Sequence, residues 1–369
     1  MILEAMRLDY LRSEWTIPED FLRFSHFERV VDQLDMSSSP GYPYMTQYSS
    51  NALFFGVVDG VKDEGRKWSI FKMVTEQLQA RVSDPIRLFI KPEPHKQTKI
   101  DNRAYRLISS VSVVDQIIDH MLFDDFNLKI QDNHIYQVPQ VGWAPVKQGW
   151  MHVPTTGVAM DKSGWDWTVL PWILEMILEL RIALCVNMTE EWKDLASWRY
   201  QQLFQQPLFV TSGGHLLKQK QPGVMKSGCV NTISDNSMAQ DLLDKVVECR
   251  TGIHSDWMMT MGDDTYQSVP SDIKLYVAEL SKYCKVKDVV FAAEFAGFRF
   301  DLNWIEPLYT AKHCYTLLHL EDSLAEETAA AYALLYHRSR KGKTIKRIAA
   351  EVTQLPSDAW LDEVWDGED

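Results

Sequence analysis

The chain has 369 residues, of which 46% are hydrophobic and 11% aromatic, and this composition excludes a disordered or fibrous protein. The formal net charge of -13 at pH 7 argues against a non-specific nucleic-acid coat protein, because phosphate binding requires cations. However, residues 351–369 contain seven acidic residues and no basic one. Without these seven charges the rest of the chain carries -6, which is compatible with a locally basic channel.

In the first half of the chain, we expect helices at 18–34 and 65–82, a basic extended segment at 87–108, a helix at 112–130 and a strand at 156–161. Helices are then expected at 167–186, at 190–203 and from after Ser227 to about 248. Two short strands flanking 262–264, a helix at 271–283 and strands near 285–300 follow, and the remainder is predicted to be mainly helical. Helices and strands are mixed without strict β-α-β alternation. The predicted fold class is therefore α+β.

Two features of the composition limit the cellular context. The five cysteines are scattered without a C-x-x-C pair, which is typical of reduced thiols in a cytosolic protein and excludes a disulfide framework or an obvious zinc site. The N-terminal residues lack the apolar core of a signal peptide, so we expect none. The most apolar stretch, 167–186, contains Glu175, Glu179 and Arg181, which favours a core helix over a transmembrane segment.

Two groups of aspartates accompany predicted strands. Asp161 ends one strand, and Asp166 follows five residues later at the start of a helix. Asp263 and Asp264 follow Gly262 between two short strands, although an isolated Gly-Asp-Asp is most often a solvated turn. Carboxylates from two strand ends suit Mg²⁺ together with substrate phosphates. Two such ions stabilise both the attacking and the leaving oxygen of a phosphoryl transfer.

A third motif lies between these carboxylate sites, directly after Lys226. It fits S-G-x-x-x-T-x-x-x-N and consists of Ser227, Gly228, Thr232 and Asn236. The glycine permits an unusual backbone beside a helix N-terminus. The threonine and asparagine are four residues apart and project from one helix face. An ordinary capped helix with polar surface residues is the alternative interpretation.

Two runs of basic residues are candidate phosphate-binding segments. Between Arg81 and Arg106, seven Lys or Arg accompany three Asp or Glu, and the cations alternate with apolar residues. Such an extended segment suits a triphosphate channel, although a solvated charged loop is the commoner meaning. The second run lies between Arg338 and Arg347 and includes Arg340 and Lys341. A charged helix surface is the alternative there.

Together the motifs resemble the RNA-directed RNA polymerases of positive-strand RNA viruses, most closely the sobemovirus-like and polerovirus-like group. The resemblance covers about residues 37–300, and the spacings of 66 residues from Asp161 to Ser227 and 36 from Ser227 to Asp263 agree with it. The matching segments are Asp161–Asp166 (motif A), Ser227–Asn236 (motif B), Gly262–Asp264 (motif C), Lys285–Val289 (motif D), Glu294–Phe298 (motif E), Lys91–Arg106 (motif F) and Ser38–Pro43 (motif G).

The resemblance implies a right-hand fold of fingers, palm and thumb, with an antiparallel palm sheet flanked by helices. It implies that an RNA 3′-hydroxyl attacks the α-phosphate of an NTP chosen by a template base, with two Mg²⁺ or Mn²⁺ ions. The implied metal ligands are Asp161, Asp263 and Asp264. The implied proton donor to pyrophosphate is Lys285 or Lys287, which strand alternation would put on one face.

Further roles follow from the same resemblance. Asp166 and Asn236, assisted by Thr232, would sense the ribose 2′-hydroxyl. Ser227 and Gly228 would shape the loop between template and nucleotide. The groups expected to grip the triphosphate are Lys91, Lys99 and Arg106. The groups expected to contact RNA are Ser39, Pro40 and Gly41 for the template and Arg338, Arg340 and Lys341 for the product duplex.

The implied domains are fingers at 1–110 with an insertion at 191–226, a palm at 111–190 and 227–302, and a small thumb with an acidic tail at 303–369. We expect the end of the tail, 362–369, to be exposed and to face away from RNA or compete weakly with it. The expected partners are RNA template, product strand and NTPs, and the resemblance allows a viral protein primer. We expect no transmembrane segment, and we expect the protein to act in replication complexes of the host cytoplasm.

Two alternative functions share the palm. A reverse transcriptase-like polymerase makes DNA and has no need to sense a 2′-hydroxyl, so the combination of Asp166 with the S-G-x-x-x-T-x-x-x-N motif argues against it. A catalytically silent RNA-binding protein would have lost at least one metal-binding carboxylate, yet all three are present. The sequence leaves open the mode of initiation, the host and the oligomeric state.

Overall fold

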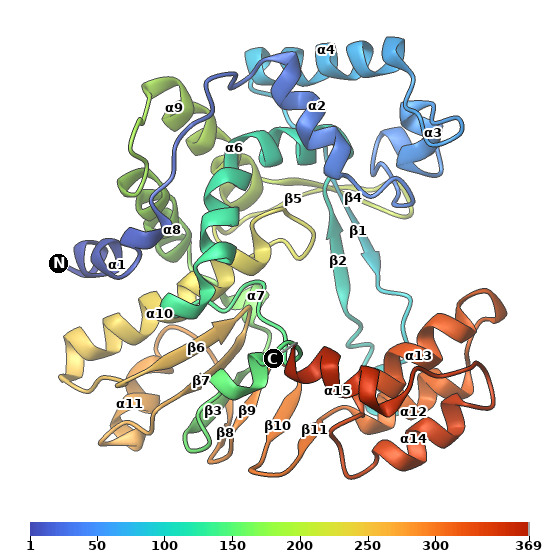
Figure 1. Ribbon diagram of the computed structural model, residues 1–369. Helices are drawn as coiled ribbons and strands as arrows, with labels where there is room; N and C mark the ends of the chain where they lie inside the picture. Colours follow the sequence, from blue (N-terminus) through green and yellow to red (C-terminus); the bar gives the residue numbers. More distant parts are fainter. Residues whose placement is uncertain (368–369) are drawn as a thin grey trace.

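The computed structural model describes residues 1–367, and it consists of an upper helical part, a central sheet and a C-terminal group of helices (Figure 1). The upper part is built from α2 (Phe24–Gln33), α3 (Asn51–Phe55), α4 (Glu64–Ala80) and α6 (Val113–Asp132). Helices α2 and α4 pack against each other and against α6. The main hydrophobic core runs through this contact and includes the fully buried Phe27, Val74 and Phe123.

A four-stranded sheet extends from the upper part toward the C-terminal helices (Figure 1). Its strands, in the order β2-β1-β4-β5, are β1 (Ile86–Ile90), β2 (Leu107–Ser110), β4 (Leu208–Thr211) and β5 (Leu216–Lys218). Strands β1 and β4 are parallel, and the other neighbours are antiparallel. The short helix α5 (Gln97–Asp101) lies between β1 and β2, so the segment predicted as extended at 87–108 is extended only at its two ends.

The central sheet is antiparallel throughout, in the order β6-β7-β3-β8. Its strands are β3 (Val158–Lys162), β6 (Met258–Met261), β7 (Asp264–Gln267) and β8 (Val286–Val290), and the helices α10 (Thr232–Thr251) and α11 (Ile273–Leu280) pack beside it. Val158 and Met160 belong to the main core, whereas Ala159 faces a second core, as strand alternation requires. The antiparallel central sheet and its flanking helices confirm the mixed α and β composition.

Three predicted helices differ from those observed. Leu22 adopts a positive φ of 63°, which interrupts a helix, and α2 therefore begins only at Phe24. The helix predicted at 167–186 is divided into α7 (Trp165–Thr168) and α8 (Pro171–Ala183), because the residue before a proline favours extended backbone. Helix α9 (Glu190–Tyr200) continues into a π-helical turn at 201–205, and α1 (Ile2–Asp9) packs against α8 and α10.

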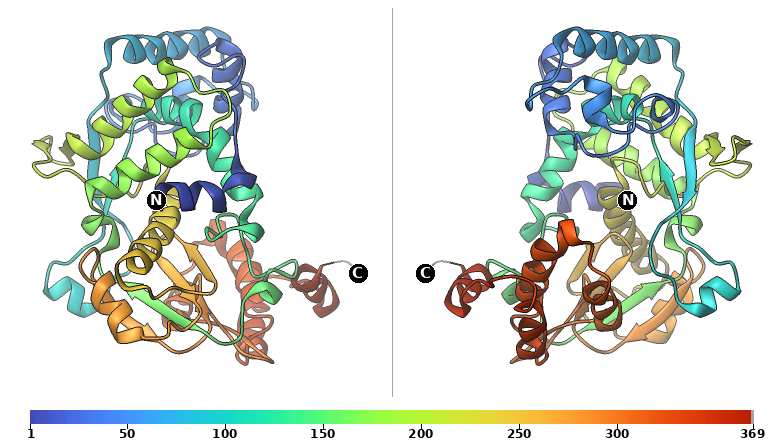
Figure 2. Two further views of the ribbon diagram at one scale, coloured as in Figure 1. Left: turned by 90° about the vertical axis from the view of Figure 1, so that its left-hand side faces the viewer. Right: turned by 90° about the vertical axis from the view of Figure 1, so that its right-hand side faces the viewer.

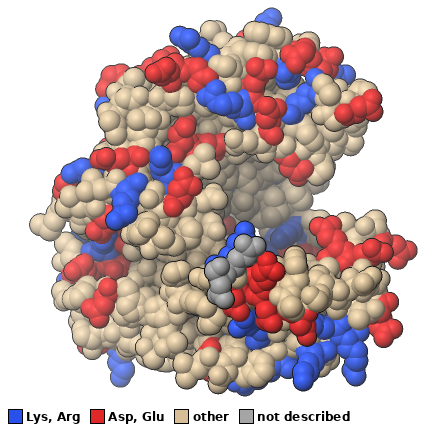
Figure 3. Space-filling view, in the orientation of Figure 1, with Lys and Arg blue, Asp and Glu red and all other residues tan. Residues whose placement is uncertain are grey.

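Between residues 291 and 367, the chain forms a small sheet and four α-helices. They are β9 (Glu294–Phe295), β10 (Phe298–Phe300), β11 (Ile305–Pro307), α12 (Thr310–Leu318), α13 (Ala325–Leu335), α14 (Gly342–Ala349) and α15 (Asp358–Asp366). Helix α15 projects from the face that Figure 1 turns toward the viewer (Figure 2). Between the upper part and the C-terminal helices, the surface is hollowed (Figure 3). Within residues 1–367, no helix has the length and apolar character needed to cross a lipid bilayer.

The segment 362–369 was predicted to be exposed, and among its described residues Asp362 and Glu363 are exposed whereas Trp365 is not. Trp365 is only 1% exposed and packs in the second core with Trp143 and Phe295. Its indole Nε1 donates to the carbonyl of Leu334, 3.0 Å away. The charge pattern alone concealed this anchor, because a single tryptophan among acidic residues still has a large apolar surface to bury. Residues 368 and 369 lie outside the described part of the chain.

Candidate active site

The two carboxylate groups predicted from the sequence lie at the ends of neighbouring strands. Strand β3 pairs with β7 so that Met160 is opposite Thr265, which brings Asp161 beside Asp264. Both aspartates line one cavity of about 310 Å³. On the other side of β3, the Lys287 ammonium lies 2.7 Å from Asp161 Oδ2. The antiparallel register therefore assembles two carboxylates and a lysine from segments far apart in the sequence.

The turn that carries Asp263 and Asp264 is held in place by α10. Gly262 has a φ of +64°, which glycine adopts without the steric penalty of a side chain. Its amide donates to the hydroxyl of Ser237, 2.8 Å away, and the hydroxyl of Thr260 donates to the Ser237 carbonyl at 2.9 Å. Ser237 was not predicted as a site residue, although its position one residue after Asn236 on the same helix was a usable signal.

The electrostatics of this site favour a bound cation. Burial, followed by the charge of Asp263, raises the pKa of Asp264 to about 6. Beneath the site, burial lowers the pKa of Lys162 to about 8, and its ammonium donates to Thr265 Oγ1 at 2.5 Å. The described residues contain no preassembled group of three or more potential ligands close enough to hold a metal ion. The donors are nevertheless hard carboxylate oxygens that repel one another, and this chemistry fits Mg²⁺ or Mn²⁺.

Asp166 and Asn236 form a second, partly buried polar pair. Asn236 Nδ2 donates to Asp166 Oδ1 at 3.0 Å, and the asparagine is only 4% exposed. Within the described residues, the other polar atom of this side chain, Asn236 Oδ1, is buried without a hydrogen-bond partner. Burial raises the pKa of Asp166, although the hydrogen bond from Asn236 opposes that shift. A ligand hydroxyl would satisfy the unpartnered oxygen.

The loop before α10 packs tightly against β2. A Cβ on Gly228 would lie 2.3 Å from the carbonyl oxygen of Ser109, so only glycine fits there. Ser227 Oγ accepts a hydrogen bond from the Ser109 amide at 3.2 Å. Thr232 Oγ1 donates back to the carbonyls of Lys226 and Cys229 at 2.7 and 2.8 Å. The threonine hydroxyl therefore closes this loop, while the asparagine on the same helix face reaches Asp166.

The basic segment around β1 and β2 is gathered by one acidic residue. Glu93 is 3.3 Å from the Lys91 ammonium, 3.1 Å from the Arg106 guanidinium and 3.8 Å from the ammonium of Lys312 in α12. The segment is thus linked to the C-terminal helices. Lys99 is exposed on α5 and is not one of the cations around Glu93. In the sequence, Glu93 is only one of the acidic residues in the basic run, and its contact with several cations was not predicted.

The sequence model of the family described as viral RNA-dependent RNA polymerase matches residues 26–289. This chain belongs to that family. It is 36% identical over 225 residues to protein P1-P2 of Pea enation mosaic virus-1, covering 55% of this chain and 18% of the relative. It is 34% identical over 267 residues to protein P1-P2 of Potato leafroll virus, covering 66% and 24%.

A third relative of this chain is the replicase polyprotein P2AB of Southern cowpea mosaic virus. The identity is 34% over 221 residues, which cover 57% of this chain and 22% of the relative. The chain thus spans less than a quarter of each of these three relatives. Their viruses match the group that the motifs resemble, and the sequence-based family assignment is confirmed.

The residues predicted to contact the template, Ser39, Pro40 and Gly41, lie beside the start of α6. The carbonyl of Pro40 accepts a hydrogen bond from the Val113 amide at 2.8 Å. Gly41 has a φ of +69°, and a Cβ there would lie 3.0 Å from the backbone of Ser112. Ser39 is exposed, and its hydroxyl accepts from the Gly41 amide at 3.3 Å. Glycine is therefore required where this turn contacts the helix.

The basic run in the C-terminal helices is paired within the chain. Arg338 forms an ion pair with Asp366, and Arg340 lies 3.1 Å from Asp301. The Lys341 ammonium donates to the Thr310 hydroxyl at 3.0 Å. Acidic side chains gather near α15 on the lower lip of the hollow (Figure 3). The acidic end and the basic run therefore neutralise each other in part.

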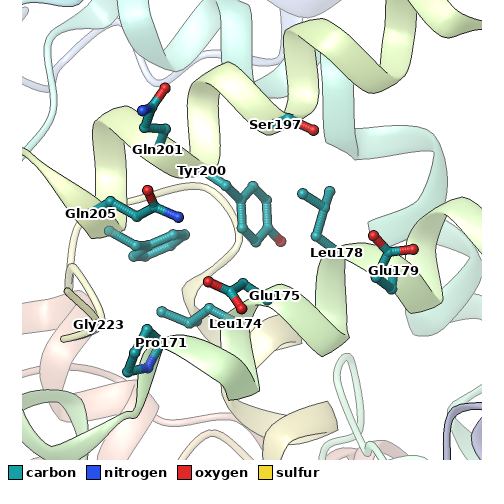
Figure 4. A pocket seen from close by; sticks show the side chains of 11 residues that line it. Pro171, Leu174, Glu175, Leu178, Glu179, Ser197, Tyr200, Gln201, Gln205 and Gly223 are labelled. Carbon is teal, nitrogen blue, oxygen red and sulfur yellow. The ribbon is translucent and has the colours of Figure 1, made fainter.

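Lys285 and a separate cavity lie apart from the site residues described above. Lys285 precedes β8 and is exposed. The pairing of β3 with β8 is irregular between Asp161 and Lys162. Of the two lysines predicted as proton donors, Lys287 is therefore the one that contacts Asp161. A separate cavity of about 240 Å³ lies between α8 and the end of α9, with Glu175 and Tyr200 pointing toward it (Figure 4). None of the predicted site residues lines that cavity.

Proposed function

We propose that this chain is an RNA-directed RNA polymerase, which extends an RNA 3′-hydroxyl with NTPs selected by a template strand. The observation that carries the proposal is the meeting of Asp161 and Asp264 at the ends of adjacent strands. Together with Asp263, they would hold two Mg²⁺ or Mn²⁺ ions. When bound, such ions lower the pKa of the attacking hydroxyl and stabilise charge on the leaving oxygen.

Selection of ribose is assigned to Asp166 and Asn236. The buried, unpartnered Oδ1 of Asn236 accepts a hydrogen bond from the 2′-hydroxyl, while Nδ2 keeps the Asp166 carboxylate in place. A deoxyribose would leave this oxygen without a partner, and an unsatisfied buried acceptor is unfavourable. Thr232 supports the pair by closing the loop that precedes α10.

Binding of the triphosphate is assigned to Arg106 and Lys91, with Lys99 as a further contact. Glu93 forms ion pairs with Lys91 and Arg106, and the triphosphate would replace its carboxylate as their partner. When the 3′-oxygen attacks the α-phosphate, the bond to the β-phosphate breaks. Lys287 then gives a proton to the departing pyrophosphate, and we prefer it to Lys285 because of its contact with Asp161.

The proposed domains keep the boundaries expected from the sequence: fingers at 1–110 and 191–226, palm at 111–190 and 227–302, and thumb at 303–369. The parallel pairing of β1 with β4 supports joining the first two segments into one domain, because it ties residues 86–88 to residues 209–211. The central antiparallel sheet supports the assignment of the palm. By its family, we propose that the protein acts in replication complexes of the host cytoplasm.

The test is synthesis by the purified protein on a defined RNA template. We expect incorporation of rNTPs with Mg²⁺ or Mn²⁺, little incorporation of dNTPs, and no product from Asp263→Ala. Equal use of dNTPs on an RNA template would indicate a reverse transcriptase instead. RNA binding without synthesis by the wild type would indicate a catalytically silent protein. Running primed and unprimed templates in parallel determines the initiation mode; none of the contacts among residues 1–367 supports a protein primer.

A further inference from the structure

A buried lysine lies directly behind the carboxylate site. Lys162 follows Asp161 in β3, but it is only 4% exposed and does not line the cavity that contains Asp161 and Asp264. Its ammonium donates to Thr265 Oγ1 at 2.5 Å and lies 3.5 Å from the carbonyl oxygen of Met160. The lysine is therefore held between β3 and β7, the two strands that bring Asp161 and Asp264 together.

The charge of Lys162 has no anion in direct contact with it. The hydrogen bonds of its ammonium go to neutral oxygens, and the ion pairs among residues 1–367 include none to this lysine. Burial of a charge without a paired anion is costly. The ammonium must therefore be stabilised by charges that act from a longer distance.

The carboxylates on the other side of the strands are the source of that stabilisation. Burial lowers the pKa of Lys162, and the charges that oppose this shift are those of Cys284, Asp263, Asp264 and Asp161. The thiol of Cys284 is neutral at physiological pH, because burial raises its pKa as well. The three aspartates therefore remain as the anions that face the buried ammonium.

The stabilisation is reciprocal, because three carboxylates in one site repel one another. Burial and the charge of Asp263 raise the pKa of Asp264, whereas the charge of Lys162 acts in the opposite direction. A second ammonium, that of Lys287, lies 2.7 Å from Asp161 Oδ2. Two positive charges of the chain itself thus balance part of the charge of the aspartates.

The two lysines differ in their freedom to move. More than half of the Lys287 side chain is exposed, so this ammonium can turn toward solvent when another cation approaches Asp161. Lys162 is enclosed between the strands, and its neighbours Met160 and Cys284 belong to the main core. The buried ammonium therefore stays in place and repels any cation that binds to the aspartates.

We propose that Lys162 is an internal counter-charge that weakens the binding of free Mg²⁺ or Mn²⁺ to Asp161, Asp263 and Asp264. Divalent ions then bind tightly only when a triphosphate supplies further oxygen ligands and negative charge. This agrees with the lack, among the described residues, of three potential ligands close enough to hold an ion. The inference rests on the proposed function for the identity of the metal ligands. Lys162 is a positioning residue, because it acts through the aspartates and contacts neither ion nor nucleotide.

The test measures Mn²⁺ binding to the purified chain without RNA or nucleotide, from the loss of the electron paramagnetic resonance signal of free Mn²⁺. Lys162→Met removes the charge and keeps an unbranched apolar side chain that suits a buried position. Lys162→Gln also removes the charge, but it keeps a hydrogen-bond donor for Thr265 Oγ1. Lys72→Met is the matched control, because Lys72 is an exposed lysine of α4 in the upper part of the molecule.

We expect both neutral variants of Lys162 to bind Mn²⁺ about tenfold or more tightly than the wild type, because a unit charge close to a divalent ion changes the binding constant by at least this factor near a protein surface. Added Mn²⁺ should also raise the unfolding temperature of these two variants more than that of the wild type. Lys72→Met should match the wild type in both measurements.

Three results would overturn the inference. The first is unchanged or weaker Mn²⁺ binding in both Lys162 variants. The second is a change in Lys162→Met that Lys162→Gln does not share, because the hydrogen bond to Thr265 rather than the charge would then control the site. The third is tight Mn²⁺ binding by Lys162→Met that persists when Asp263→Ala is added, because the ion would then lie elsewhere.

Failure of the polymerase proposal has a different signature. If the wild type synthesises RNA while both Lys162 variants bind Mn²⁺ as the wild type does, only the inference about Lys162 falls. If both variants bind Mn²⁺ more tightly and Asp263→Ala abolishes that binding, the counter-charge is supported. In that case, a wild type that makes no RNA under any condition removes only the polymerase proposal.

Discussion

Asn236 donates a hydrogen bond of 3.0 Å to the carboxylate of Asp166, although seventy residues separate the two in the sequence. The bond uses only one end of the asparagine amide. The other end, Oδ1, is buried without a partner among the described residues. The pair therefore combines a fixed carboxylate with a buried acceptor that has no partner among the described residues.

The first prediction concerns the choice of sugar. We expect Asn236→Ala and Asp166→Ala to lower the ratio of rNTP to dNTP incorporation by about tenfold or more, because each removes part of a site built for a hydroxyl. Single-nucleotide extension with matched rNTP and dNTP measures the ratio. Ser227→Ala serves as a comparison outside the pair. If the ratio is the same in both variants and the wild type, neither residue discriminates between the sugars.

The second prediction concerns the carboxylates and the ions. Asp161→Ala and Asp263→Ala should each reduce synthesis by several orders of magnitude while the protein stays folded, because each removes a ligand for ions that neutralise developing charge. A chelator should abolish synthesis, and added Mg²⁺ should restore it. Asp256→Ala removes an exposed carboxylate on the approach to β6 and should leave the rate unchanged. Near-normal synthesis by Asp263→Ala would show that the site is assigned incorrectly.

The third prediction concerns the C-terminal helix. Trp365→Ala should lower the free energy of unfolding by about 3–5 kcal/mol, since it leaves a large cavity in the second core. Trp360 lies on the same helix and is 48% exposed, so Trp360→Ala should cost less than about 1 kcal/mol. Denaturant unfolding measures both values. Deletion of 362–369 should destabilise the protein similarly, and a stable deletion variant would contradict the anchoring role of α15.

The fourth prediction separates two arginines of the basic run. Arg340 is exposed, whereas Arg338 lies between Asp362 and Asp366 of α15. We expect Arg340→Gln to reduce the slope of log affinity for duplex RNA against log salt by about 1, since one phosphate contact is lost. Arg338→Gln should leave the slope unchanged and lower the unfolding temperature. Equal slopes for Arg340→Gln and wild type would mean that this run does not contact RNA.

The fifth prediction concerns the dependence of stability on pH. Burial raises the pKa of Asp241 to about 6, and its carboxylate accepts a hydrogen bond of 2.8 Å from the Tyr10 hydroxyl. An aspartate in the unfolded chain has a pKa of about 4. The folded state therefore binds the carboxyl proton of Asp241 more tightly than the unfolded state does. The stability that this proton contributes to the fold is lost as the pH rises from about 4 to 6.

Asp241→Asn should remove this dependence while keeping an acceptor for Tyr10. Relative to the wild type, the variant should gain about 3 kcal/mol of unfolding free energy between pH 4 and pH 7. Denaturant unfolding at both pH values gives the difference, with Asp256→Asn as an exposed control. A constant difference between variant and wild type across this range would show that Asp241 does not titrate between them.

The amino-acid sequence was enough to assign the family, the α+β class and the order of the motifs, because the motif residues, among them Asp161, Gly228 and Asp263, follow the order and spacing that resemble the family. Gly228 also makes a close backbone contact that a side chain would not allow. The sequence also placed most helices and strands, since their apolar spacing is a local property. It could not show that α15 is anchored by Trp365, because charge density dominates that segment while burial depends on a distant core.

Only in the folded chain does Tyr309 reach the cavity of Asp161 and Asp264, Glu93 lie near Lys312, and Lys287 rather than Lys285 contact Asp161. These relationships depend on strand register, an irregular pairing of β3 with β8, and packing between segments more than a hundred residues apart. No periodicity or spacing within a segment encodes them, because each arises only when the chain has folded and distant segments share one surface.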